Sequence, residues 1–109
     1  MAGSLPPHKL EQAIDYIHTH LGENISLLAI ATELDMSQYY FCRLFKQSMG
    51  MTPHQFVILQ RIERAKYLLH HTKKTILNIA DECGFADSSH FAKHLTRRVG
   101  IPPGEFRKK

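Results

Sequence analysis

The sequence predicts an all-α protein in which two similar helical subdomains are joined by a long central helix, with about seven helices in all. Two observations predict this. Apolar residues recur with helical spacing, and no stretch has the strict alternation typical of a strand. In addition, one segment is repeated in a similar form: "FCRLFKQSMGMTPHQF" at residues 41–56 resembles "FAKHLTRRVGIPPGEF" at residues 91–106. Apolar residues make up 43% of the 109 residues, which is enough for a packed interior.

The repeat is longer than the quoted segment. With an offset of 49 residues, Ile30 and Ala31 align with Ile79 and Ala80; one residue is then inserted near Ala86, and an offset of 50 follows. The later aligned pairs are Phe41 with Phe91, Arg43 with Lys93, Phe45 with Leu95, Gly50 with Gly100, Pro53 with Pro103 and Phe56 with Phe106. This many matches in one register predict a structural duplication.

The elements of the first copy follow from capping residues and apolar stripes. A first helix is predicted over residues 8–21, where Leu and Ile recur on one face and Gly22 follows. Ser26 caps a second helix over residues 27–34, and Asp35 with Met36 makes a turn. Ser37 then caps a third helix over residues 38–49, which Gly50 ends.

The second copy repeats this pattern. Thr75 caps a helix over residues 76–83, and Gly84 makes the turn. Asp87 caps the next helix, over residues 88–99, and Gly100 ends it. Two short helices joined by a turn of three or four residues are typical of a helix-turn-helix unit, so each copy is predicted to be one.

The central helix is predicted over residues 54–71, with Pro53 at its first turn, where a missing N–H costs nothing. Such a helix would span ~27 Å, close to the ~34 Å between major-groove faces on one side of B-DNA. We therefore expect a tail at residues 1–7, a first helix-turn-helix subdomain at 8–52, a linker helix at 53–72 and a second subdomain at 73–109.

Charge is distributed unevenly along the chain. Residues 1–36 contain one base and five acids, whereas residues 37–74 contain seven bases and Glu63 as their one acid. The second helix of each copy contains no acid at all, over residues 37–49 and again over residues 88–99. Donors without carboxylates suit a groove lined with phosphates and base-edge acceptors, so these helices are predicted to contact a polyanion.

At this point the sequence resembles the DNA-binding domain of the AraC/XylS family of bacterial transcription regulators. The resemblance covers about residues 8–107 and is carried by "SLLAIATELDMSQYYFCRLFKQSMGMTPHQF", "RIERAKYLL" and "TILNIADECGFADSSHFAKHLTRRVGIPPGEFR". It implies promoter control by one chain that reads two successive major grooves of an asymmetric double-stranded DNA site. It also implies a cytoplasmic protein that touches RNA polymerase, and an effector or dimerisation domain that this chain has no room for.

The resemblance also assigns the DNA-contacting positions of both reading helices. In the first helix they are Gln38, Tyr39, Cys42, Arg43 and Lys46. In the second helix they are Ser88, Ser89, His90, Lys93 and Arg97. Arg43 is the best candidate for a bidentate contact to guanine, because its planar fork matches two acceptors. Thr96 stands where the family usually has a base, and Arg97 with Arg98 can replace it. Arg61, Lys73 and Lys74 are further candidates for phosphate contacts.

Three other functions are alternatives to DNA binding. His90 and His94, four apart on one helix, could chelate a divalent ion, but no third ligand is evident and no metal or other cofactor is expected. Cys42 and Cys83 could serve an enzyme only with a base and a stabiliser nearby, so catalysis is not expected. A protein-interaction module that docks through the acidic first third is the remaining alternative.

The sequence also predicts the cellular compartment, because it lacks a membrane-spanning segment, a signal peptide and a Cys-x-x-Cys pair. No apolar run approaches the roughly 20 residues of a membrane-spanning helix, and residues 1–10 have no signal-peptide pattern. The two cysteines are far apart with no Cys-x-x-Cys pair, which indicates reduced thiols in a cytosolic protein.

Overall fold

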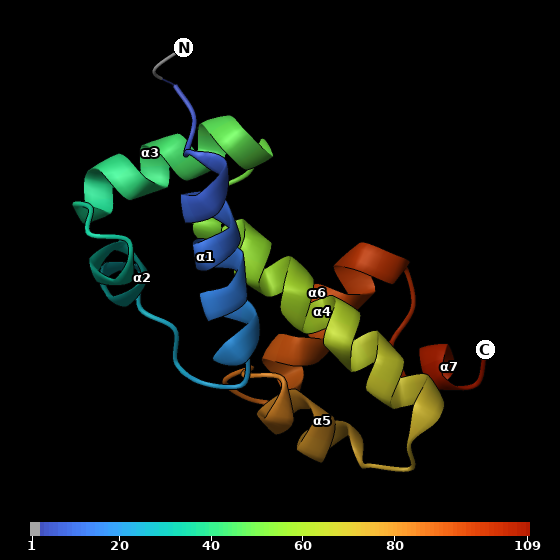
Figure 1. Cartoon of the computed structure of the whole chain (residues 1–109). Helices are drawn as coiled ribbons and strands as arrows, with labels where there is room; N and C mark the ends of the chain where they lie inside the picture. Colours follow the sequence, from blue (N-terminus) through green and yellow to red (C-terminus); the bar gives the residue numbers. More distant parts are fainter. Residues whose placement is uncertain (1–2) are drawn as a thin grey trace. The chain divides into compact units, whose positions relative to one another are not determined.

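The protein folds into seven α-helices, as seen in a computed structural model that describes residues 3–109, a range that contains no strand (Figure 1). The helices are α1 (Pro7–Thr19), α2 (Leu27–Glu33), α3 (Gln38–Met49), α4 (Pro53–His71), α5 (Ile76–Glu82), α6 (Ser88–Val99) and α7 (Pro103–Arg107). The prediction of an all-α fold is confirmed. Residues 1 and 2, the start of the predicted tail, lie outside the described residues.

The chain divides into two compact units, of which the first ends at Val57 and the second begins at Ile58. Unit 1 holds α1, α2, α3 and the first turn of α4, and unit 2 holds the rest of α4 with α5, α6 and α7. Each unit has a hydrophobic core of its own. The boundary falls inside α4, which is continuous, so one helix supplies apolar side chains to both cores.

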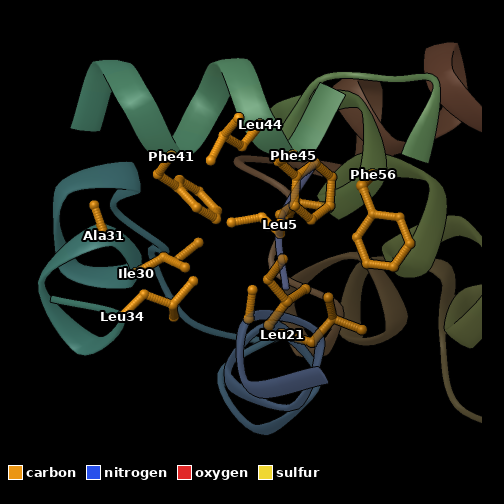
Figure 2. Close-up of a cluster of buried hydrophobic side chains, with 12 residues drawn as sticks. Leu5, Leu21, Ile30, Ala31, Leu34, Phe41, Leu44, Phe45 and Phe56 are labelled. Atoms are coloured by element: carbon orange, nitrogen blue, oxygen red, sulfur yellow. The ribbon is translucent and has the colours of Figure 1, made fainter. Parts of the chain in front are cut away.

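The core of unit 1 is built around aromatic side chains (Figure 2). Phe41 and Phe45 of α3 are fully buried, and the Phe45 ring meets the Phe56 ring edge-on at 5.6 Å between centroids. Leu5, which precedes α1, is also buried, and its N–H donates to Ser48 Oγ at 2.8 Å. The segment before α1 is therefore packed against the end of α3 at this residue.

The capping residues predicted where the short helices begin. The side chains of Ser26, Ser37, Thr75 and Asp87 each accept a hydrogen bond from the N–H three residues later, at 2.7 to 3.2 Å. These four bonds satisfy amides that have no partner inside a helix. The predicted N-caps of both helix-turn-helix pairs are confirmed.

The turn within each pair depends on one residue in the left-handed conformation. Asp35 has a φ of 58° and its counterpart Gly84 a φ of 88°, which glycine adopts without strain and Asp tolerates better than most residues. The amide of the next residue, Met36 or Phe85, then donates to a carbonyl five residues earlier at 2.9 Å. The same geometry at corresponding positions confirms that the duplication is structural.

Helix α1 differs slightly from its prediction. It ends at Thr19, one residue before His20, whose N–H and ring Nδ1 both lie within hydrogen-bond distance of the Tyr16 carbonyl at 3.1 and 2.9 Å. The His20 ring also stacks on the Tyr16 ring at 4.1 Å. The prediction that the helix extends to residue 21 was wrong, because these contacts end it at His20.

Unit 2 is closed by contacts between α7 and the C-terminal end of α4. The Arg107 guanidinium donates to the carbonyls of Leu69, Thr72 and Lys74 at 3.1, 3.4 and 2.5 Å. Beside it, His70 Nε2 donates to the Phe106 carbonyl at 2.9 Å, and the His70 and Phe106 rings stack at 4.5 Å. A single arginine thus satisfies carbonyls that the end of α4 leaves without partners.

We expect the substitution Arg107→Ala to lower the free energy of unfolding by about 1.5–3 kcal/mol, the usual contribution of hydrogen bonds to a charged group. Urea denaturation followed by far-UV circular dichroism measures this loss. Arg107→Lys should not restore stability, because one ammonium cannot reproduce the planar fork that reaches three carbonyls. Arg98→Ala, which removes an exposed arginine of α6, is the matched control. Equal losses in both alanine variants would contradict this role for Arg107.

Candidate nucleic-acid interface

Burial of one side of α3 fixes which of its residues point to solvent. Phe41, Leu44 and Phe45 are buried in the core of unit 1. Of the predicted contact residues, Gln38, Tyr39, Arg43 and Lys46 are exposed, and Cys42 is half-buried. Tyr39 leaves 77% of its surface exposed, more than Tyr40 of the same helix at 47%. An aromatic side chain this exposed has area to give to a partner.

Burial of one side also fixes which residues of α6 point to solvent in unit 2. Phe91 and Leu95 are fully buried and hold the helix by one side. Of the predicted contact residues, Ser89, His90, Lys93 and Arg97 are exposed, and Ser88 is half-buried. Both predicted sets therefore lie at the surface. We call α3 and α6 the reading helices, and the side of each that opposes its buried residues the reading face.

The reading faces are electrostatically uniform. Neither helix contains an Asp or a Glu. Within residues 3–109, Lys66 pairs with Glu63 at 3.2 Å and Lys74 pairs with Glu82 at 2.5 Å. Five bases of the reading helices take part in neither pair: Arg43, Lys46, Lys93, Arg97 and Arg98. Their charges are available to an anionic partner, and no neighbouring carboxylate on the same helix opposes one.

The two reading faces correspond residue by residue through the repeat. With the offset of 50, Ser89 takes the place of Tyr39, and Lys93 takes the place of Arg43. Applied to Cys42 and Lys46, the same offset leads to Ala92 and Thr96, both half-buried, so Ala92 is a position on the reading face of α6 that the sequence analysis did not assign. The repeat register could have identified it.

His90 lies at the edge of the reading face of α6. At about 100° per residue, it is about 100° around the helix from Ser89, about 60° from Lys93 and about 20° from Arg97. Its Nε2 is 3.2 Å from His94 Nε2, and both rings lie against Phe85, at 5.9 and 6.1 Å between centroids. The counterpart of His90 in unit 1 is Tyr40, which the sequence analysis did not assign to DNA contact.

The bases outside the reading helices differ in their surroundings. The Lys74 ammonium is already paired with Glu82. Arg61 is half-buried, and burial lowers the pKa of its guanidinium, an effect that Cys83 partly opposes. Lys73 is exposed. Of the three bases predicted to contact phosphate from outside the reading helices, it is therefore the best candidate.

Neither cysteine has the environment of a catalytic thiol. Burial raises the pKa of the Cys42 thiol, and burial raises that of Cys83 to about 11 despite the positive charges of Arg64, Arg61 and Lys74 nearby. A nucleophilic cysteine needs the opposite shift, because the thiolate is the reactive form. These thiols are not activated.

The described part of the chain offers little to other classes of site. Residues 3–109 contain no group of three or more His, Cys, Asp or Glu side chains placed to hold a metal ion. Within the same residues, no helix combines the length and the apolar character needed to cross a membrane.

Comparison with known families gives one match, to a helix-turn-helix domain, over residues 30–109. Among curated proteins, a probable transcriptional regulator, LumQ of Photobacterium leiognathi, is 35% identical over 92 residues, covering 84% of this chain and 37% of that protein. The chain spans little more than a third of the length of the curated relatives it matches.

Two solved structures resemble the whole fold. An AraC-type DNA-binding domain protein from Chromobacterium violaceum superposes with a TM-score of 0.88 at 32% identity, covering 94% of this chain and 91% of that one. The DNA-binding domain of AdpA, solved in complex with a target DNA, superposes with a TM-score of 0.87 at 28% identity, covering 92% of this chain and 90% of that one.

The raised thiol pKa values predict slow alkylation of the folded protein. With a pKa of about 11, roughly one Cys83 side chain in a thousand is a thiolate at pH 8, against about a quarter for a free cysteine. Mass spectrometry after treatment with iodoacetamide should find Cys83 unmodified in the native state and modified at a normal rate in urea. Cys42 should react at an intermediate rate. Rapid native labelling of Cys83 at pH 8 would contradict this description.

Proposed function

Because the chain belongs to the AraC-type family of helix-turn-helix DNA-binding domains, we propose that it binds double-stranded DNA at specific sequences and so regulates transcription at promoters. The observation that carries this proposal is the pair of exposed, acid-free reading faces on α3 and α6. The AdpA domain, which shares this fold, binds a target DNA.

In unit 1, the side chains of α3 have the chemistry to recognise bases. Arg43 is exposed and presents a planar fork that fits the O6 and N7 acceptors of guanine. Tyr39 and Gln38 begin the helix, next to the Ser37 cap, where residues of a recognition helix reach base edges. Lys46 stands one turn further along and suits a phosphate of the groove wall.

In unit 2, the predicted contact residues of α6 suit the DNA backbone better. Ser88 and Ser89 lie at the helix N-terminus, where free amides and the helix dipole favour phosphate. Lys93 and Arg97 are exposed bases one helical turn apart. We assign α6 to a second major groove, because the duplication gives each unit its own reading helix. Two different reading faces in one chain require an asymmetric site.

The wider biology of the protein rests on the family. We propose that it acts in the cytoplasm without catalysis, and that RNA polymerase is a further partner at the promoter. The curated relatives are much longer than this chain, so an effector-binding or dimerisation domain is a proposed part of the full regulator.

Selection from a randomised duplex library, followed by binding of the enriched sequence at two salt concentrations, tests the function. We expect a bipartite motif with elements about one helical turn apart, and an affinity that falls steeply with salt as counterions are released. A single short element would limit base reading to α3. No enrichment, with salt-insensitive binding to a protein partner, would favour the interaction module.

Arg43→Ala should weaken binding to the selected sequence by about 1–3 kcal/mol and relax preference at one base pair. Affinity for selected and random duplexes, measured by fluorescence anisotropy, separates the two roles open to Arg43. A specific loss on the selected duplex is expected, because the bidentate contact exists only with the matching base. The control is Arg64→Ala, which removes an exposed arginine outside both reading helices. Equal loss on both duplexes would assign Arg43 to phosphate.

A further inference from the structure

The second reading helix carries two imidazoles that converge on one point. The Nε2 atoms of His90 and His94 lie 3.2 Å apart, and the two rings are nearly perpendicular at 87°. Phe85 packs against both rings, at 5.9 and 6.1 Å between centroids, and His94 is half-buried. His90 is exposed, so the pair lies at the surface with the Phe85 ring beside it.

We propose that His90 and His94 form a two-ligand site for a borderline divalent transition metal such as Zn²⁺, Ni²⁺ or Cu²⁺. Zinc binds imidazole nitrogen at about 2.0–2.1 Å, so two nitrogens at a tetrahedral angle are about 3.3–3.4 Å apart. The observed 3.2 Å lies close to this separation. The ion replaces the hydrogen that the two Nε2 atoms share, and the rings need no large movement. Mg²⁺ and Ca²⁺ prefer oxygen ligands and should not bind.

The sequence contains no evident third ligand beside these histidines, and the described residues supply none. The nearest candidate along the helix, Asp87, uses its Oδ1 to cap α6 through the His90 amide at 2.7 Å. A site with two protein ligands leaves the remaining coordination positions to water. Its ion is therefore expected to exchange readily, unlike the ion of a closed structural zinc site with four protein ligands.

The corresponding place in unit 1 cannot chelate. There the offset of 50 puts Tyr40 and Leu44 in place of the two histidines, and both line a surface hollow with Met36 and Lys9. The proposed site is thus specific to unit 2. It borders the reading face of α6, because Arg97 lies within about 20° of His90 around the helix, so metal binding is measured on the protein without DNA.

The test is titration of the intact chain with Zn²⁺ and, separately, Ni²⁺, followed by calorimetry and by NMR of the imidazole protons. We expect one ion per chain, with shifts confined to His90 and His94. Loss of an outer-shell partner costs a metal site roughly 10- to 100-fold, so His90→Gln or His94→Gln should each weaken binding by at least about tenfold. Because the ion cross-links one turn of α6, it should also raise the melting temperature of the wild type but not that of His90→Gln or His94→Gln.

Two matched variants make the result specific. His54→Gln removes an exposed histidine of α4, and Cys42→Ser removes the half-buried thiol, since thiolates also bind zinc. Both should bind the ions as the wild type does. Unchanged affinity in His90→Gln and His94→Gln, or imidazole shifts centred on other histidines, would overturn the proposal. This outcome would leave the DNA-binding proposal standing, because no step of the titration involves DNA.

Discussion

The structure depends on the small size of each unit. A unit of little more than 50 residues buries a smaller fraction of its surface than a larger domain does, so each core also draws apolar residues from flanking segments. Unit 1 draws in Leu5 from before α1 and Phe56 with Val57 from the first turn of α4. Unit 2 uses the rest of α4, through Ile62 and Leu69. The long helix is therefore a structural member of both units as well as the connection between them.

The two copies of the repeat are joined through α4. Pro53 and Phe56 at the start of α4 correspond to Pro103 and Phe106 in α7. The first turn of α4 is thus the final element of the first copy, and the remainder of α4 opens the second. In the second copy, α7 stops at Arg107, which donates hydrogen bonds back to the end of α4. In the first copy, the helix continues beyond the point that corresponds to the end of α7. Helix α4 is therefore both the last element of the first copy and the first element of the second.

Local chemistry made most of the fold predictable. A capping side chain, a left-handed residue and a glycine each act within about four residues, so Ser37, Asp87 and Gly50 could be assigned from the sequence. Contacts between distant residues could not. The Leu5 amide reaches Ser48 across 43 residues, and Arg107 reaches Leu69 across 38. Neither pair leaves a periodic signal, because each depends on how the helices pack.

The candidate site was predictable to the extent that core packing fixes helix rotation. Phe41 and Phe91 recur in the repeat and are fully buried, so the exposed sides of α3 and α6 could be deduced from the apolar stripes. The contact between His90 and His94 could not, because it depends on side-chain rotamers, which residue spacing alone does not specify.

The two units share a scaffold, but their reading faces have diverged in side-chain size. Where α3 presents Tyr39 and Arg43, the same positions in α6 hold Ser89 and Lys93. A serine hydroxyl reaches far less deeply into a groove than a tyrosine ring, and an ammonium lacks the planar fork that selects guanine. Phosphate contacts position a protein on DNA, whereas base contacts specify the sequence. If both helices enter the major groove, the discrimination should therefore concentrate in unit 1, and unit 2 should supply register and salt-dependent affinity.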